Sequence, residues 1–517
     1  MMKMTNLPIS CASIDSQPRR FLSNQLFLWL WVFFNAVLAA FGGGTLAFGP
    51  LELDLPLVLL FGIGFGILGG GLWVWALRFP ARTRALGALT LAFILDLGLL
   101  SLFQMRAAGQ ILVNNNNRAA NFEQLCQVIQ AHYPYFDEKN INWDETCRRY
   151  QPLVQAAQTD SEYHALVADL LAELGDGHTG FVQPYPGEGR LYFGAGLSLD
   201  DGIVIDQIGN TARAAGVLHG AQILAVNGLP VEQALQALPA ALKVGVNDRQ
   251  SRERAAFHIL STSEDFLELT YQNPDGQTAT VLLRRPQNPP APANTKNANA
   301  ESLITAETLP QGWGLIRIPT FSPRDGHDLT AEFDRALEAV RAAPGLILDL
   351  RGNGGGDSRL AEQMAGRFFA ERFCYGEDRF RQRLPLRGWS LRFAYCVQPR
   401  GETVTVPLVL LMDGRNMSSA EQFIAIFRES RRAVTIGRTS GGSSGNPLTF
   451  PLTGGGLIRF STGAFYTRSG LLVEGHGIQP EIHVPYTVAD FQQNCDPDLQ
   501  AAQAELNRLT ALPTSRK

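Results

Sequence analysis

The sequence has no excess of positive charge and no basic stripe. Its 517 residues include 44 Lys and Arg against 48 Asp and Glu, a formal net charge of −4 at pH 7. Proteins that bind nucleic acid usually present clustered Lys and Arg on one face or along one helix. We therefore expect no nucleic acid among the partners of this protein.

Cysteine is scarce, and the six cysteines lack the spacing of a metal site. No CxxC pair occurs, and no Cys and His residues are spaced as zinc ligands. Two local disulfides, Cys126–Cys147 and Cys374–Cys396, are compatible with the sequence and would leave Cys11 and Cys495 unpaired. Spacing alone leaves the connectivity open.

Two glycine motifs lack the context that nucleotide binding requires. Gly64-x-Gly66-x-x-Gly69 lies inside an apolar run instead of between a strand and a helix. RGNGGGDS, residues 351–358, follows a predicted strand, but no Gly-Lys-Ser/Thr comes after it, which argues against a P-loop. Its glycines instead expose backbone N–H groups near a helix N-terminus, which suit an anion or a developing oxyanion.

Long apolar runs are confined to the N-terminal region, at 25–48, 55–77 and 84–103. A membrane-spanning helix needs about 20 apolar residues. A signal peptide has one short apolar region and does not explain three runs. We predict a three-helix membrane anchor over residues 21–104, the alternative being buried helices of a soluble domain. Few ionisable residues interrupt the runs, Asp96 being the clearest, which favours an anchor over a transport pathway.

Charges in the flanking loops predict the orientation of these spans. Lys and Arg precede the first run and separate the second from the third, whereas the loop between the first two holds Glu52 and Asp54. By the positive-inside rule, residues 1–20 form a cytoplasmic tail. Three spans then place the chain after about residue 105 in the periplasmic or extracellular space.

The rest of the chain divides by pattern into several parts. Residues 119–187 show helical periodicity. Residues 188–285 contain short strand-like runs of the kind found in a small β-rich binding module. Residues 286–303 have the Pro, Asn and Ala content of a linker. We expect an α/β domain over 304–490 and a C-terminal tail over 491–517.

The α/β part alternates strand-like and helix-like segments. GLILDL at 345–350 and VPLVLLMDG at 406–414 read as strands, each followed by a predicted helix. This alternation predicts βαβ crossovers and a mainly parallel sheet. Ligand sites in such sheets lie at the carboxyl ends of the strands. RGNGGG at 351–356 and MDGRNMSSAEQF at 412–423 are therefore candidate site loops.

Two adjacent serines, Ser418 and Ser419, lie at one of these junctions. The spacing Ser418-x-x-Glu421 fits a capping box, in which the serine only caps the helix. A serine nucleophile would need a neighbouring base. Candidate partners are His178 in ELGDGHTGF and Glu474 in VEGHGIQPE, and each segment alone is typical of an ordinary glycine-rich loop.

Four segments, in this order, resemble the successive signatures of the tail-specific, or C-terminal-processing, serine protease family. They are ELGDGHTGF, LILDLRGNGGGDS, LVLLMDGRNMSSAEQF and LLVEGHGIQPEIHV. The resemblance covers roughly residues 119–487 and extends to the tricorn protease core. It implies a ClpP/crotonase-like α/β protease core of parallel-rich sheet and helices over 304–490, and a PDZ-like substrate-binding module at 188–285.

The resemblance also implies the catalytic residues. The family places its nucleophile three residues before the glutamate of the serine-rich motif, which is Ser418 here. The processing branch uses a lysine base where this sequence has serines, Ser443 and Ser444. The tricorn-like branch uses a histidine and a glutamate, matched by His178 as base and Glu474 as orienting acid. Gly177 stands where that branch has a serine.

Backbone N–H groups of Gly354 or Gly355, and of Ser419, complete the predicted set as the oxyanion hole. This chemistry requires no metal and no cofactor. We expect a membrane-anchored serine endopeptidase that hydrolyses peptide bonds of proteins or peptides. The alternative is a non-catalytic binding or carrier protein on the same fold, as in the interphotoreceptor retinoid-binding relatives.

Overall fold

The computed structural model describes residues 117–183, 191–284, 302–381 and 391–511. The expected cytoplasmic tail and membrane anchor, 1–104, lie outside these residues, as does nearly all of the expected linker. Within the described ranges, every helix is too short or too polar to cross a bilayer.

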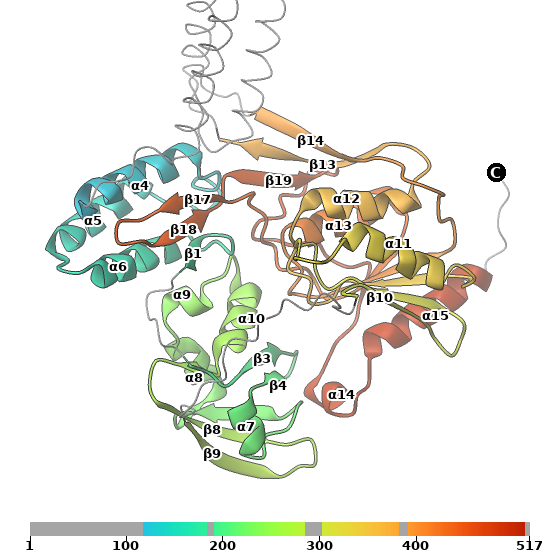
Figure 1. The fold of residues 1–517 in the computed structure, drawn as a ribbon, viewed down its shortest axis with the longest axis horizontal. Coiled ribbons are helices and arrows are strands. Elements are labelled where there is room, and N and C mark those ends of the chain that lie inside the picture. The colour runs from blue at the N-terminus through green and yellow to red at the C-terminus, as the bar shows by residue number, and fades with distance from the viewer. Residues whose placement is uncertain (1–116, 184–190, 285–301, 382–390, 512–517) are drawn as a thin grey trace, which may run out of the picture. The chain divides into compact units, whose positions relative to one another are not determined.

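A six-stranded sheet forms the centre of the α/β part (Figure 1). Its strands, in spatial order, are β10 (Thr305–Thr308), β11 (Gly314–Arg317), β12 (Leu346–Asp349), β15 (Leu408–Met412), β16 (Val434–Gly437) and β20 (Ile482–His483). Only the β10–β11 pair is antiparallel. The predicted parallel-rich α/β core is confirmed.

Helices cover both faces of this sheet. Leu348 and Leu410 pack with α11 (Leu329–Ala339), α12 (Ser358–Ala365) and α13 (Ser419–Ser430). The alternate residues Ile347 and Val409 pack on the other face with α15 (Pro497–Ala511). Burial on both faces explains why β12 and β15 are continuous apolar runs in the sequence. Most of the segment expected as a C-terminal tail is therefore a helix of the core.

The helical part shares a core with strands far away in the sequence. It comprises α4 (Arg118–His132), α5 (Trp143–Ala156), α6 (Asp160–Ala172) and β1 (Gly180–Gln183). β1 joins β18 (Leu457–Phe460) and β17 (Leu448–Pro451) in an antiparallel sheet, which Figure 1 shows beside α4, α5 and α6. Leu125, Tyr133, Ile458 and Phe460 lie in one buried cluster. This pairing brings the loop before β1 to the α/β part.

Both local disulfides are present. Cys126–Cys147 joins α4 to α5, and Cys374–Cys396 joins β13 (Phe373–Phe380) to β14 (Leu391–Val397). These strands form a second small sheet with β19 (Gly463–Thr467). Cys495 is free. The local pairing considered from the sequence is the one that the structure adopts.

The β-rich module has its own sheet and hydrophobic core. Its strands are β2 (Leu191–Tyr192), β3 (Gly194–Ser198), β4 (Ile203–Ile208), β5 (Gln222–Val226), β6 (Leu229–Pro230), β7 (Ser261–Thr262), β8 (Phe266–Gln272) and β9 (Thr278–Arg284). β3 and β9 are the edges of its main sheet. The edge of β3 is covered by α10 (Asp248–His258), because a Cβ on Gly196 would lie 2.6 Å from the Ala256 carbonyl oxygen.

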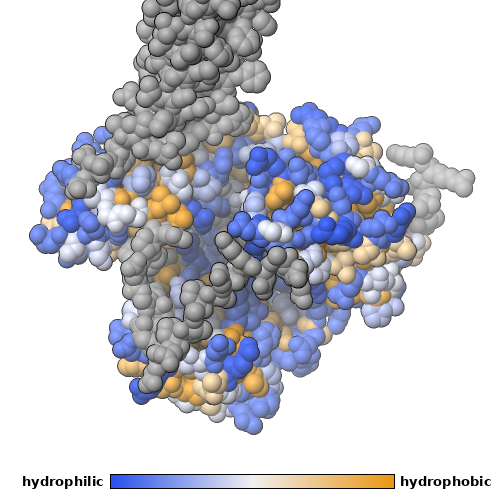
Figure 2. All heavy atoms as spheres, viewed as in Figure 1, coloured by the Kyte–Doolittle hydropathy of each residue, from blue (hydrophilic) through white to orange (hydrophobic). Residues whose placement is uncertain are grey.

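The surface of the described part is mainly hydrophilic on the face shown in Figure 2, where hydrophobic residues form separate small patches. Large exposed apolar side chains come from different elements, for example Leu153 on α5 and Leu282 on β9. Scattered single residues of this kind are normal for a folded domain.

Candidate active site

Ser418 occupies a sharp turn between β15 and α13. Its backbone has φ of 58° and ψ of −128°, a conformation that costs a non-glycine residue about 1–3 kcal/mol. The Ser418 N–H donates to the Ser443 carbonyl oxygen at 2.8 Å and helps to hold the turn. A strained strand-to-helix turn of this kind presents the serine hydroxyl of many hydrolases.

The capping box that the sequence permits is not completed by Ser418. Its side chain makes no capping hydrogen bond to α13. The Glu421 carboxylate instead accepts hydrogen bonds from the Ser440 hydroxyl at 2.5 Å and the Gly442 N–H at 2.8 Å. Burial raises the pKa of Glu421 to about 8. Glu421 therefore holds the loop at 440–443, and the Ser418 hydroxyl is not committed to a cap.

Ser419 differs from Ser418 in exposure. It is the first residue of α13 and only 1% exposed. Its buried hydroxyl has no hydrogen-bond partner among the described residues. Of the two adjacent serines, Ser418 is the one that lines the candidate pocket.

A pocket of about 350 Å³ brings together most of the predicted site residues. Its lining consists of Gly177, His178, Thr320, Ser322, Gly354, Gly355, Gly356, Met417, Ser418, Pro447 and Arg459. The structure thus places the candidate nucleophile, base and glycine loop around one space, although they come from separate segments. Ser419 and Glu474 do not line it.

His178 is held by buried polar groups. Its Nδ1 lies 2.9 Å from the Ser443 hydroxyl oxygen. The Asp176 carboxylate fixes the turn by accepting hydrogen bonds from the His178 N–H and the Thr179 hydroxyl, both at 2.8 Å. Burial, helped by the Arg459 cation and opposed by Asp176, lowers the pKa of His178 to about 4. The ring is therefore neutral near pH 7, as a general base must be.

No direct hydrogen bond joins Ser418 to His178 within the described residues, although both line the pocket. Catalytic hydrogen bonds are often long in a site without substrate and shorten in the complex. Because Nδ1 faces Ser443, Nε2 is the ring nitrogen left to exchange a proton with Ser418.

Glu474 acts on the loops around His178 instead of on the ring. Its carboxylate accepts hydrogen bonds from Lys139 Nζ at 2.9 Å and from the Ser444 N–H at 3.1 Å. Lys139 also donates to the Gly175 carbonyl oxygen at 2.6 Å. Burial, followed by the Asp176 charge, raises the pKa of Glu474, and Lys139 partly offsets this. Lys139 and Glu474 therefore connect the turn before His178 to the loop that carries Ser443.

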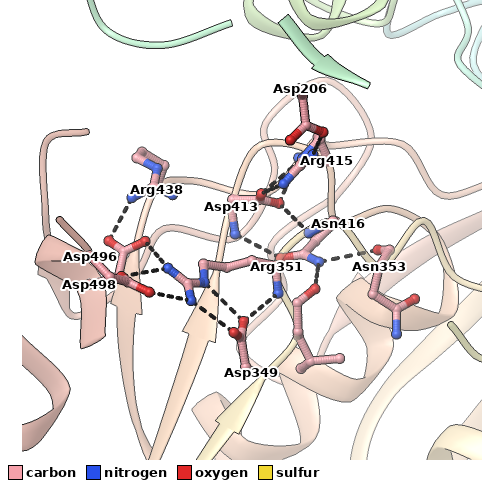
Figure 3. A network of polar contacts seen from close by, with 12 residues as sticks. Asp206, Asp349, Arg351, Asn353, Asp413, Arg415, Asn416, Arg438, Asp496 and Asp498 are labelled. Atoms are coloured by element: carbon pink, nitrogen blue, oxygen red, sulfur yellow. Dashed lines mark hydrogen bonds and ion pairs between the residues drawn. The ribbon is translucent and has the colours of Figure 1, made fainter. Parts of the chain in front are cut away.

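The glycine loop 352–356 is fixed to the loop of Ser418 by side-chain amides and carboxylates (Figure 3). Asn416 Nδ2 donates to the Leu350 carbonyl oxygen at 2.6 Å and to that of Asn353 at 3.1 Å. The Asp413 carboxylate accepts from the Gly352 N–H at 3.0 Å. The relative position of the two loops is thus set before any substrate binds.

Backbone donors near Ser418 are not equivalent. The Gly355 N–H donates to Asn353 Oδ1 at 2.8 Å. Within the described ranges, the Gly354 and Ser419 N–H groups make no hydrogen bond. A Cβ on Gly355 would lie 2.9 Å from Ser418 Cβ, and its φ is 98°, so glycine is required there. Gly354 and Ser419 remain as the free donors of the predicted oxyanion set.

Residues 312–484 match the model of a family described as peptidase family S41, and residues 114–172 match the tricorn protease C1 domain. The α/β part of the chain is thus similar to peptidase family S41, and its helical part to the tricorn protease C1 domain. The family expected from the four sequence motifs is confirmed, and its members include carboxyl-terminal-processing serine peptidases.

Similar proteins come from both branches that the motifs resemble. The putative tricorn protease homolog 2 of Streptomyces coelicolor is 25% identical over 408 residues, covering 74% of this chain and 31% of the relative. The chloroplastic carboxyl-terminal-processing peptidase 1 of Arabidopsis thaliana is 22% identical over 383 residues, covering 69% of this chain and 70% of the relative. The chain thus spans about a third of the length of its tricorn-type relative.

The fold of this chain also occurs in a solved structure. The crystal structure of mature CPAF aligns with a TM-score of 0.59 at 16% identity, covering 77% of this chain and 96% of that one. At this identity the likeness concerns the fold alone.

Three polar residues of the candidate site were not predicted from the sequence, namely Lys139, Asp176 and Ser443. For Ser443 a signal existed, since it lies in the stretch where the processing branch has its lysine. A Cβ on Gly177 would lie 2.4 Å from Ser443 Oγ, so the Ser443 hydroxyl occupies space that a side chain at 177 would need. In the described part of the chain, no cluster of three or more His, Cys, Asp or Glu is arranged to hold a metal ion.

Proposed function

We propose that this protein is a serine endopeptidase with Ser418 as nucleophile and His178 as general base. The observation that carries the proposal is the shared pocket, which holds the strained Ser418, the neutral His178 and the glycine loop. Ser418 Oγ attacks the peptide carbonyl carbon, and His178 Nε2 takes the hydroxyl proton and later delivers it to the leaving amine.

The remaining groups support this step. Ser443 Oγ accepts a hydrogen bond from Nδ1–H of His178, which selects the tautomer with Nε2 free and stabilises the imidazolium that forms. The free N–H groups of Gly354 and Ser419 bind the developing oxyanion. Glu474 is a positioning residue that acts through the Ser444 N–H and Lys139.

The proposal includes a membrane anchor over 21–104 and action on the outer side of the membrane. The three apolar runs and the distribution of Lys and Arg support it. The disulfides Cys126–Cys147 and Cys374–Cys396 support it independently, because disulfides persist mainly in oxidising compartments.

Substrate capture by a PDZ-like module at 188–285 is also part of the proposal. Capture by strand addition at β3 requires α10 to separate from that edge, because their backbones are in contact. The other edge strand, β9, is exposed along most of its length.

The decisive experiment uses the full chain in detergent and a library of internally quenched fluorogenic peptides. Wild-type protein should cleave members of the library, whereas Ser418→Ala should not. Mapping of a bound fluorophosphonate should place the label on Ser418. A wild-type protein that cleaves nothing would favour the carrier alternative, and equal cleavage by Ser418→Ala would refute the assigned nucleophile.

A further inference from the structure

Arg459 lies beside the candidate catalytic residues on the middle strand of a small sheet. It is on β18, directly opposite Gly180 of β1 and Thr449 of β17. Its neighbours along the strand, Ile458 and Phe460, are buried. Since side chains alternate between the two faces of a strand, Arg459 lies on the face opposite to the one that carries Ile458 and Phe460. It is exposed and lines the pocket of Ser418.

The Arg459 guanidinium has no counter-charge in the described part of the chain. It forms no ion pair and no hydrogen bond there, whereas Arg351 and Arg438 are paired with buried Asp498. Neither Gly180 nor Thr449 carries a charge, and the residues that line the pocket include no Asp or Glu. Arg459 is thus the one ionised side chain in the lining, given a neutral His178.

The space next to Arg459 is open. A Cβ on Gly180, its cross-strand neighbour, would meet no atom within 4 Å. The Arg459 charge also reaches the catalytic ring, because it lowers the pKa of His178. A group bound at this cation would therefore lie next to the reacting bond.

We propose that Arg459 determines specificity by binding a carboxylate of the substrate. This inference rests on the proposed peptidase function. A guanidinium presents a planar pair of N–H donors that matches the two oxygens of a carboxylate. The carboxylate belongs either to an Asp or Glu side chain near the scissile bond or to the C-terminus of the substrate.

The test measures kcat/KM with matched quenched peptides derived from one cleaved library sequence. One series replaces Gln by Glu at each position flanking the scissile bond, and a second compares a free C-terminal acid with its amide. We expect at least one carboxylate to raise kcat/KM by about tenfold or more, as a charge-assisted hydrogen bond does. The series that shows the effect identifies the source of the carboxylate.

The substituted proteins are Arg459→Gln, Arg459→Lys and Arg459→Glu, with Arg335→Gln as control. Arg335 is exposed on α11, does not line the pocket and forms no ion pair among the described residues. Arg459→Gln should bring the carboxylate-to-neutral ratio close to one, Arg459→Glu should invert it, and Arg335→Gln should leave it unchanged. Arg459→Lys, which keeps the charge without the planar fork, should retain part of the preference.

A wild-type protein that cleaves both members of every pair equally would overturn the inference and leave the peptidase proposal intact. A carboxylate preference that survives in a folded Arg459→Gln protein would also overturn it. Absence of any Ser418-dependent cleavage would instead refute the peptidase proposal, and this inference with it.

Discussion

Ser443 Oγ lies 2.9 Å from Nδ1 of His178, and the two residues are 265 positions apart. Both side chains are buried. The same hydroxyl oxygen would be 2.4 Å from a Cβ at residue 177, where the tricorn-like branch is expected to have a serine. A serine side chain at 177 would approach His178 through the space that the Ser443 hydroxyl fills. Ser443 fills this space from a different loop.

Ser443→Ala should lower kcat by about 10- to 100-fold with little change in KM, because a mispositioned base loses its near-attack geometry. Steady-state kinetics on a cleaved peptide measures this. Ser444→Ala is the matched control, since it removes a buried hydroxyl that has no partner among the described residues. In a Gly177→Ser background, Ser443→Gly should recover activity relative to Gly177→Ser alone. Equal losses in Ser443→Ala and Ser444→Ala would contradict the assigned role.

Ser418→Ala should reduce kcat by at least about 10³-fold, as loss of a nucleophile does in other serine peptidases. Ser419→Ala should cost less than about tenfold, because the proposed contribution of Ser419 is its backbone N–H, which alanine keeps. The measurement is hydrolysis by each purified variant at equal folded concentration. A larger loss of kcat in Ser419→Ala than in Ser418→Ala would mean that Ser419, and not Ser418, is the nucleophile.

Ser418→Gly should be more stable than Ser418→Ala by about 1 kcal/mol, although neither hydrolyses peptides. Glycine adopts the positive φ of this turn without the strain that a Cβ imposes. Thermal unfolding of the two variants, followed by circular dichroism, gives the difference. Ser430, at the end of α13, offers a control position where Ser→Gly should not stabilise the fold. A Ser418→Ala protein as stable as Ser418→Gly would show that the turn is unstrained.

Lys139→Met should destabilise the fold by about 3 kcal/mol, because it leaves a buried carboxylate without its cation. The Lys139 and Glu474 side chains are 17% and 2% exposed. The double variant Lys139→Met, Glu474→Gln should regain much of this stability, since no charge is then left unpaired. Denaturant unfolding of the four proteins forms a double-mutant cycle. Additive effects in the cycle would mean that the pair does not interact.

The acidic limb of kcat/KM should lie near pH 4, the lowered pKa of His178. The base must be neutral, so activity falls only when protons bind the ring. A histidine with an unperturbed pKa would give an acidic limb at about pH 6.5. Arg459→Gln removes a cation that lowers the pKa of His178, so the acidic limb of this variant should move to higher pH. The acidic limb of Arg335→Gln should not move. A wild-type limb near the ordinary value would exclude the buried, neutral His178 as the titrating base.

Local patterns were enough to predict the parallel-rich sheet and the location of its site loops. β12 and β15 are buried on both faces, so their apolar runs are continuous and recognisable without a structure. α15 was missed because its burial depends mainly on Ala502 and Leu506, a pattern that resembles an ordinary polar helix or tail. Its assignment to the core required the sheet face that it covers.

Local sequence patterns identify which residue types are available: a serine at a strand-to-helix junction, a histidine in a tight turn and glycines after β12. How these residues come together depends on the packing of the folded chain. Lys139 reaches Glu474 across 335 positions, and the pairing of β1 with β18 brings His178, in the turn before β1, to the α/β part. Such contacts depend on the packing of segments far apart in the chain, which residue spacing does not encode.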